Sequence, residues 1–191
     1  ASLEPDLQAT GSTKKQGLQR SGPTGRPEGS NPSQHRGSQI PISPRSAHSG
    51  LRTHQLLEQI SWIDESPPSI PKDELGYQIH RLLETPGLGF VFRRDSRPID
   101  LLREQAVEIQ QGSQRFRSVM DRVHLHKSPD GEIHRIEIFD FKTDTETNAE
   151  LLRERHLPQL TTYRKFFNAI YPSAQIDCFL VSVPTGRLIP I

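Results

Sequence analysis

The sequence has a single cysteine and lacks any long apolar run. Cys178 is the single cysteine among the 191 residues, so this chain alone cannot form a disulfide or a four-cysteine metal cluster. Its apolar neighbours in IDCFLV predict a buried thiol of an intracellular protein. No apolar stretch approaches the roughly 20 residues of a membrane span, and the amino terminus lacks the apolar core of a signal peptide. We therefore expect no membrane contact and no iron–sulfur cluster.

Aromatic residues are absent from residues 1–49, which are rich in Ser, Gly, Pro, Gln and Arg. Such a composition buries too little apolar surface to offset the entropy lost when the backbone becomes ordered. We therefore expect a linker over residues 1–47 and one folded domain over residues 48–191. Because the chain begins with Ala1 rather than Met, we also expect it to be part of a longer protein, with this linker as its tether.

Neither sign of charge is in marked excess, with 24 basic and 23 acidic side chains and a net charge of +1. Affinity for a nucleic-acid backbone is largely electrostatic, so a domain of this charge would bind DNA weakly on its own. A function on DNA would therefore need an attached partner that delivers the strand.

Hydrophobic periodicity predicts a mixed α/β sheet flanked by helices. Asp130-Gly131 predicts a tight hairpin between the second and third strands. Pro158 should bend the longest helix or mark its true start. The predicted helices cover residues 48–63, 72–87 and 148–171, and the predicted strands cover residues 101–110, 115–126, 133–142, 174–183 and 187–191.

The stretch IFDFKTD places Asp140 and Lys142 two positions apart inside an apolar run. Side chains two apart share one face of a strand, so both should point the same way, beyond a buried stripe of Ile136 and Ile138. An Asp-x-Lys triplet arises easily by chance, and charges that face water at a strand end are its ordinary explanation. The triplet alone is therefore weak evidence for a site.

Asp121 strengthens the case for a site, because it interrupts the apolar strand SVMDRV. We expect the hairpin to bring Asp121 alongside Asp140. Two close carboxylates repel each other unless a cation lies between them, and Mg²⁺ prefers oxygen ligands. With Lys142 to hold a phosphate or orient water, the set has the parts for metal-assisted hydrolysis of a phosphodiester. We expect one face of this strand to carry Val119, Asp121, Val123 and Leu125.

The stretch MDRVHLHKSPDGEIHRIEIFDFKTD, followed by QLTTY, resembles the nuclease domain of the RecB/AddA branch of the PD-(D/E)XK nucleases. These domains usually lie at the C-terminus of UvrD-like helicases. Their pattern G-x-x-D, D-x-K-T-D and Q-L-x-x-Y is matched over roughly residues 50–191. Ser118 stands where the pattern has its glycine. The resemblance implies a restriction-endonuclease-like core, and the matching positions are Asp121, Asp140, Lys142, Gln159 and Tyr163.

The resemblance also implies roles for these residues. Asp121, Asp140, the backbone carbonyl of Phe141 and a histidine would bind Mg²⁺ or Mn²⁺. Lys142 would help to activate water and stabilise charge on the phosphate. Arg122, beside the first acid, would contact a backbone phosphate.

Three further residues receive a weaker assignment. Gln159 and Tyr163 would line the cleft and touch the DNA or the attacking water, although their spacing alone is more typical of a core edge with a buried tyrosine ring. Glu104, which shares a strand face with Glu108, would support the metal site. Solvated glutamates on strands are common, so this last assignment depends on the resemblance.

The family's site histidine lies in a helix with the pattern G-x-x-x-H-x-x-x-E, and two stretches match it: GLRTHQLLE and GYQIHRLLE. We favour His54, in the helix that follows the linker, and His80 is the alternative. Without the resemblance, either would be interpreted as a surface histidine of an amphipathic helix. We interpret four others as ordinary surface residues: His124, His126, His134 and His156.

The implied function is that of a metal-dependent DNA nuclease domain, an exonuclease, in DNA end processing and recombinational repair in the bacterial cytoplasm. Its implied partners are single-stranded DNA or duplex ends and a UvrD-like helicase motor in the same longer chain or on a partner subunit. The sequence has no Gly-rich phosphate loop of its own. One alternative is a nuclease-fold module that no longer cuts and serves in DNA binding or assembly. Another is a small RecB-like nuclease that acts alone, but many of those carry the four-cysteine cluster excluded above.

Overall fold

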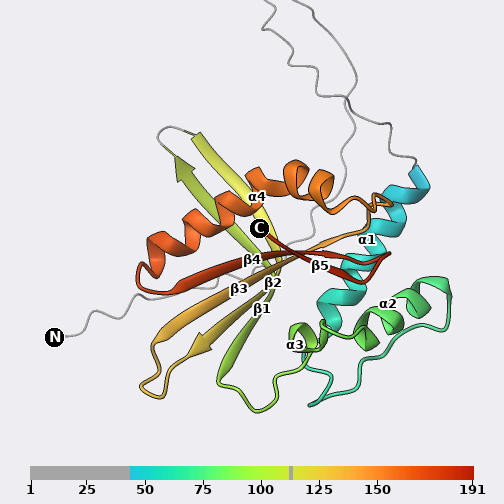
Figure 1. Ribbon diagram of the computed structural model, residues 1–191, viewed down its shortest axis with the longest axis horizontal. Coiled ribbons are helices and arrows are strands. Elements are labelled where there is room, and N and C mark those ends of the chain that lie inside the picture. Colours follow the sequence, from blue (N-terminus) through green and yellow to red (C-terminus); the bar gives the residue numbers. More distant parts are fainter. Residues whose placement is uncertain (1–43, 112–113) are drawn as a thin grey trace, which may run out of the picture. The chain divides into compact units, whose positions relative to one another are not determined.

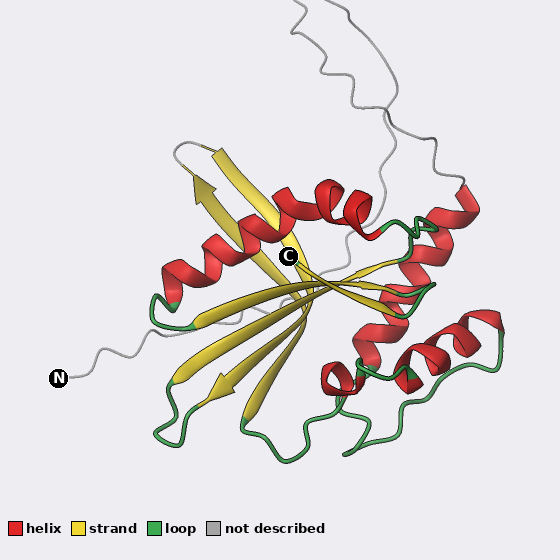
Figure 2. Ribbon diagram, viewed as in Figure 1, coloured by secondary structure: helices red, strands yellow, loops and turns green. Residues whose placement is uncertain are grey.

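The structure is a computed structural model that describes residues 44–111 and 114–191. Helix α1 begins at Pro44 rather than at His48, and the rest of the expected linker lies outside the described residues. The helices are α1 (Pro44–Gln59), α2 (Glu74–Glu84), α3 (Gly89–Phe92) and α4 (Ala149–Ile170). The strands are β1 (Ile99–Gln111), β2 (Gln114–Lys127), β3 (Ile133–Lys142), β4 (Gln175–Ser182) and β5 (Arg187–Pro190) (Figures 1 and 2).

The five strands form one mixed sheet in the order β1-β2-β3-β4-β5. Strand β3 pairs with β4 in parallel, and the other neighbouring pairs are antiparallel. A parallel pair needs a crossover connection, and α4 supplies it between β3 and β4. The predicted mixed α/β sheet with flanking helices is confirmed, and it is consistent with a restriction-endonuclease-like core.

Helices cover both faces of this sheet. On one face α4 packs on a core that includes Ile136 and Ile138, and on the other α1, α2 and α3 pack on a core that includes Phe139 and Phe141. Figure 1 shows α4 apart from the group formed by the other three helices. Strand β3 is therefore buried on both faces, which explains why its sequence is a nearly continuous apolar run. The predicted buried stripe of Ile136 and Ile138 is thus one of two buried stripes on β3, and Phe139 and Phe141 form the other.

Local signals set the ends of the elements. The side chain of Asn148 accepts hydrogen bonds from the first backbone N–H groups of α4, so the helix starts there and runs through Pro158 rather than starting at it. Gly131 has φ +89° in the turn between β2 and β3, and the predicted Asp130-Gly131 hairpin is confirmed. Helix α3 was missed because its four apolar residues are too few to show a period. No helix of the described residues is long and apolar enough to cross a membrane.

Candidate active site

The candidate site lies where β2 and β3 separate. Arg122 opposite Phe139 is the last regular pair of this hairpin, so Asp121 and Asp140 are the next facing positions. The backbones do not pair there. Instead, Oδ2 of Asp121 accepts a hydrogen bond from the backbone N–H of Phe141 at 2.6 Å. The structure thus brings the two aspartates to facing positions, and the Asp121 carboxylate takes the place of a backbone hydrogen-bond acceptor between the strands.

Strand β1 is irregular at the same level. Arg103 pairs with Arg122 and Gln105 with Met120, which leaves Glu104 opposite Asp121 without a regular pair. Glu104 has φ +46°, a left-handed conformation that is uncommon for a residue with a side chain and is often found at functional sites. This conformation turns the Glu104 side chain out of the regular alternation and toward α1.

Strand β2 also breaks its alternation at Asp121. Met120 lies in the same core as Val123 and Leu125, whereas Val119 is 41 % exposed. The expectation that Val119 shares a face with Val123 and Leu125 is therefore wrong. A strict period of two fails here because Asp121 turns its carboxylate toward the neighbouring strand rather than straight out of the sheet.

Helix α1 brings His54 to these acids. Its Nδ1 lies 3.3 Å from Oδ1 of Asp121 and 4.0 Å from Oε1 of Glu104. Gly50, one turn earlier, faces Thr143 so closely that a Cβ there would lie 3.0 Å from Oγ1 of that residue. The absence of a side chain at Gly50 thus lets α1 approach the end of β3.

His80, the alternative histidine, lies elsewhere. It is exposed on α2 and lines a surface groove together with Pro67 and Glu84. Of the two stretches that match the helix pattern, the structure places the first at the acids. The glycine of the second stretch, Gly76, is required for a different reason, because a Cβ there would overlap the backbone carbonyl of Pro71.

Asp140 and Lys142 form a largely buried ion pair, and Gln159 of α4 hydrogen-bonds to both residues. Asp140 is 2 % exposed, and its Oδ2 lies 2.6 Å from Nζ of Lys142 as an ion pair that is not aligned as a hydrogen bond. The amide of Gln159 donates to Oδ1 of Asp140 at 3.1 Å and accepts from Lys142 at 3.2 Å. Gln159 therefore fixes both residues from the side of α4.

Tyr163 lies behind Gln159, at the core edge that the spacing alone had indicated. Its ring is 1 % exposed, its hydroxyl donates to the carbonyl of Val119 at 2.7 Å, and it accepts from Gln159 at 2.7 Å. Because Tyr163 has one hydroxyl proton, the Ser118 hydroxyl, at 2.9 Å, donates to it. Tyr163 is thus too deep to touch DNA and instead orients Gln159.

We call His54, Glu104, Asp121, Asp140 and Lys142 the acidic site. Three carboxylates face one lysine there, and the pKa values respond to this excess of negative charge. Burial and then the charge of Asp121 raise the pKa of Glu104. Burial raises the pKa of Asp140 to about 6, with Lys142 opposing and Asp121 adding to the shift. The interaction with Asp121 raises the pKa of His54 although burial opposes it.

The donor set of the acidic site suits a divalent cation. His54, Glu104 and Asp121 each offer a ligand atom, and these atoms lie within 4.8 Å of one another. Oxygen ligands with one imidazole fit Mg²⁺ or Mn²⁺, and a cation would offset both the burial and the mutual repulsion of these carboxylates.

Arg122 does not reach a surface that DNA could approach. It is 1 % exposed and donates to the carbonyls of Ile60 at 2.9 Å and Ser61 at 2.8 Å. Its guanidinium also lies over the Trp62 ring, 4.8 Å from the ring centre. The expected phosphate contact is therefore corrected: Arg122 ties β2 to the segment that follows α1, because the alternation turns it toward the helix-covered face.

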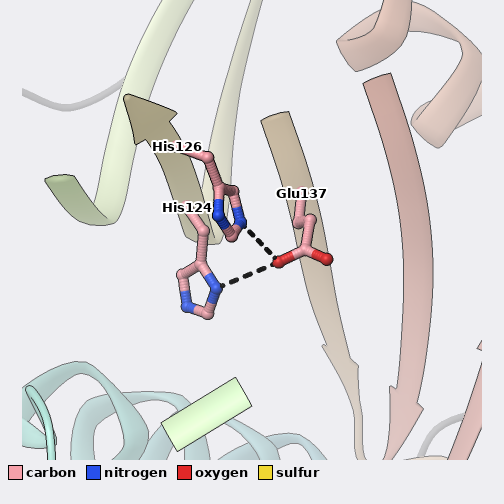
Figure 3. A group of neighbouring side chains, drawn as sticks. All are labelled: His124, His126 and Glu137. Carbon is pink, nitrogen blue, oxygen red and sulfur yellow. Dashed lines mark hydrogen bonds and ion pairs between the residues drawn. The ribbon is translucent and has the colours of Figure 1, made fainter. Parts of the chain in front are cut away.

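A second group of histidines and acid lies on the same face as Arg122. We call His124, His126 and Glu137 the histidine network (Figure 3). Oε2 of Glu137 lies 2.8 Å from Nε2 of His126 and 3.5 Å from Nδ1 of His124. Arg135 pairs with the other oxygen of Glu137 at 2.9 Å.

The proton positions of the histidine network do not suit a metal. Arg122 donates from Nε to Nε2 of His124 at 3.0 Å, and an arginine is always a donor. Nε2 of His124 is therefore unprotonated, and the proton of the neutral ring is on Nδ1, which points at Glu137. A metal-binding histidine normally donates its second N–H to an acceptor, the reverse of this arrangement. We interpret the network as hydrogen-bonded structure.

Sequence reasoning placed three histidines in the wrong environment. His124 is fully buried, and His126 and His156 are half-buried, whereas His134 is exposed as expected. The alternation Arg122, His124, His126 would have revealed one polar face of β2. It did not reveal that helices cover that face.

Comparison with known proteins supports one region. No protein-family model matches the chain. A 55-residue segment is 38 % identical to an ATP-dependent helicase/nuclease subunit of Streptococcus mutans. The segment is 29 % of this chain and spans 4 % of that protein. The chain thus contains a region related to a helicase–nuclease subunit.

Proposed function

We propose that this chain carries a metal-dependent DNA nuclease domain of the PD-(D/E)XK type, which works with a UvrD-like helicase in DNA end processing and recombinational repair. The observation that carries the proposal is the acidic site, where three carboxylates, an imidazole and a lysine converge where β2 and β3 separate and β1 is irregular at Glu104. The segment similar to a helicase/nuclease subunit supports the same class of activity.

The metal ligands in this proposal are His54, Asp121, Asp140 and the backbone carbonyl of Phe141, with Glu104 in support. When bound, Mg²⁺ or Mn²⁺ supplies Lewis-acid stabilisation of phosphate charge and a more acidic bound water. The hydrogen bond from Phe141 N–H to Asp121 holds the backbone of Phe141 beside the first acid.

The remaining residues position the reacting groups. Lys142 holds its ammonium between Asp140 and Gln159, with 16 % of its side chain exposed, so it is partly accessible from the mouth of the site. From there it would orient the attacking water and stabilise charge that develops on the phosphate. Gln159, itself fixed by Tyr163, keeps the lysine and the aspartate in register.

A scaffold that no longer cuts fits these observations less well. Burying Asp140 beside Lys142 and holding Glu104 at a positive φ both cost stability, and a purely structural module has no use for either. The near-zero net charge fits a module to which a motor delivers the strand.

Cleavage by the 191-residue chain tests the proposal. Labelled single-stranded and duplex DNA would be incubated with Mg²⁺, with Mn²⁺ and with EDTA. We expect metal-dependent cutting that falls at least about a hundredfold in Asp140→Asn and in Lys142→Met. Asp130→Asn is the matched control, because Asn-Gly is as good a hairpin turn as Asp-Gly.

The outcomes separate the two interpretations of the fold. If the wild-type chain neither cuts DNA nor binds Mn²⁺ in calorimetry, the nuclease proposal fails and the scaffold remains. If Mn²⁺ binds through Asp140 but DNA stays intact, cutting requires the helicase, and the same assay repeated with the helicase-linked protein decides the matter.

A further inference from the structure

A set of polar side chains adjoins the acidic site between the loop after β3 and the second turn of α4. Asp144 of this loop lies between two residues of the helix. Its Oδ1 is 3.5 Å from Nη1 of Arg155, and its Oδ2 is 3.5 Å from Nε2 of His156. Both distances are at the outer limit for a hydrogen bond, so the carboxylate holds neither donor tightly.

His156 belongs to the stripe of α4 that faces the sheet, between Leu152 and Leu160 at helical spacing. Its Nε2 is buried and makes no hydrogen bond. Burial and then the charge of Lys142 lower the pKa of His156 to about 4, so the ring is neutral near pH 7. Because Nε2 faces a carboxylate, we place the ring proton there, and His156 is then a donor without a well-placed acceptor.

We propose that Arg155 and His156, beside Lys142 of the acidic site, form a subsite for a backbone phosphate of DNA, which Asp144 fills while DNA is absent. This rests on the proposed nuclease function and adds to it a contact beside the phosphate that is cut. The Asp144 carboxylate is tethered to its loop and cannot approach both helix donors closely. An incoming phosphate is not tethered, and its two non-bridging oxygens accept charge-assisted hydrogen bonds from several donors at once.

DNA binding measured without cutting tests this subsite. Fluorescence anisotropy of a labelled oligonucleotide in EDTA, over a series of salt concentrations, reports Kd and its salt dependence. We expect Arg155→Gln to raise Kd about tenfold and to reduce the slope of log Kd against log salt by about one. Arg153→Gln, on the same helix but paired with Glu150 and the Pro190 carbonyl, is the matched control and should bind as the wild type does.

Asp144→Asn gives the sharpest result, because the subsite predicts a gain. Removal of the competing charge should lower Kd at least about threefold. His156→Phe keeps a ring but removes the donor, and it should raise Kd. An Asp144→Asn variant that binds more weakly than, or the same as, the wild type would overturn the subsite.

Two further results would also overturn the subsite: an Arg155→Gln variant that matches Arg153→Gln, and a wild-type chain that does not bind DNA. These binding results do not depend on cleavage. A chain that binds DNA through the subsite but neither cuts it nor binds Mn²⁺ would contradict the proposed nuclease and leave the subsite standing.

Discussion

The acidic site and the histidine network contain the same kinds of residue, yet their electrostatics are opposite. In the acidic site, burial raises the pKa of Asp140 to about 6, with Lys142 opposing the shift and the nearby carboxylate of Asp121 adding to it. In the histidine network, burial alone would raise the pKa of Glu137, but the His124 ring facing it, the hydrogen bond with His126 and the charge of Arg135 lower it to about 2. One region has room for a cation, and the other already has its positive charge.

The two groups differ in the groups that surround their histidine rings. Nδ1 of His54 faces carboxylates, whereas Nε2 of His124 accepts a hydrogen bond from Arg122, so the proton of the neutral His124 ring is on Nδ1, toward Glu137. A search for clustered histidines and acids finds both groups. Only the direction of each hydrogen bond separates a metal ligand from a member of a buried network.

The largest expected effect is on folding. Glu137→Ala should lower the free energy of unfolding by about 3 kcal/mol, because it removes a buried acceptor that faces His124 and His126, whereas Arg135 keeps Asp177 as a partner. Urea unfolding monitored by tryptophan fluorescence would measure this. Glu132→Ala, in the exposed hairpin turn, is the control. A loss below about 1 kcal/mol would remove the contrast between the two groups.

The second prediction concerns acid. Burial lowers the pKa of His124 to about 4 from its ordinary 6.5, so the folded state binds its proton less readily than the unfolded state does. Its contribution is complete above pH 6.5 and is lost as pH falls toward 4, by roughly 3 kcal/mol. Glu137 adds a further loss below pH 4.5, because its pKa is also lowered.

Asp140 acts in the opposite direction, since its raised pKa favours the protonated folded state as pH falls through about 6. Unfolding at pH 7, 5.5 and 4.5 in EDTA would separate the two groups. Toward acid pH, we expect the free energy of unfolding of the wild type to approach that of His124→Gln. We expect it to rise relative to that of Asp140→Asn. Equal pH dependence in all three proteins would contradict the assignment of His124 as buried and neutral.

The third prediction concerns metal. Asp121→Asn should raise the Kd for Mn²⁺ at least about a hundredfold, because it removes the acid that faces His54 and Glu104. His126→Gln, which alters the other candidate group, should leave Mn²⁺ binding unchanged. Isothermal titration calorimetry would measure both. Loss of binding in His126→Gln rather than in Asp121→Asn would reverse our interpretation of the two groups.

The smallest expected effect has the opposite sign from the first. Glu104→Gln should stabilise the metal-free protein by about 0.5 kcal/mol, because it removes a charge that is disfavoured by partial burial and then by repulsion from Asp121. The same variant should be less stabilised by Mn²⁺ than the wild type. Thermal unfolding of both proteins with and without Mn²⁺ would measure this. We expect Glu104→Gln to be the more stable protein without the metal and to gain less stability from it.

Much of the fold could be read along the chain. Strand β3, its hairpin with β2 and the crossover helix follow from apolar periodicity and from Asp130-Gly131, since these signals are local. The facing of Asp121 and Asp140 follows too, because a tight turn fixes the register of a hairpin. The choice of His54 needed a resemblance, because helical spacing alone did not separate it from His80.

Other features depend on contacts between distant segments. The positive φ of Glu104 and the break in alternation at Asp121 occur where β2 separates from β3 while it stays paired with β1, and no local pattern predicts that. Tyr163 and His156 occupy their positions because α4 packs on the sheet.

Alternation along β2 determines which side chains share a face, and the sequence alone could establish that Arg122, His124 and His126 point the same way. It could not establish what covers that face. Helices α1, α2 and α3 do so, and they turn apparently solvated side chains into a buried network in which Arg122 donates to His124. Side-chain direction is a local property of the backbone, whereas burial and pKa depend on what the rest of the chain brings against it.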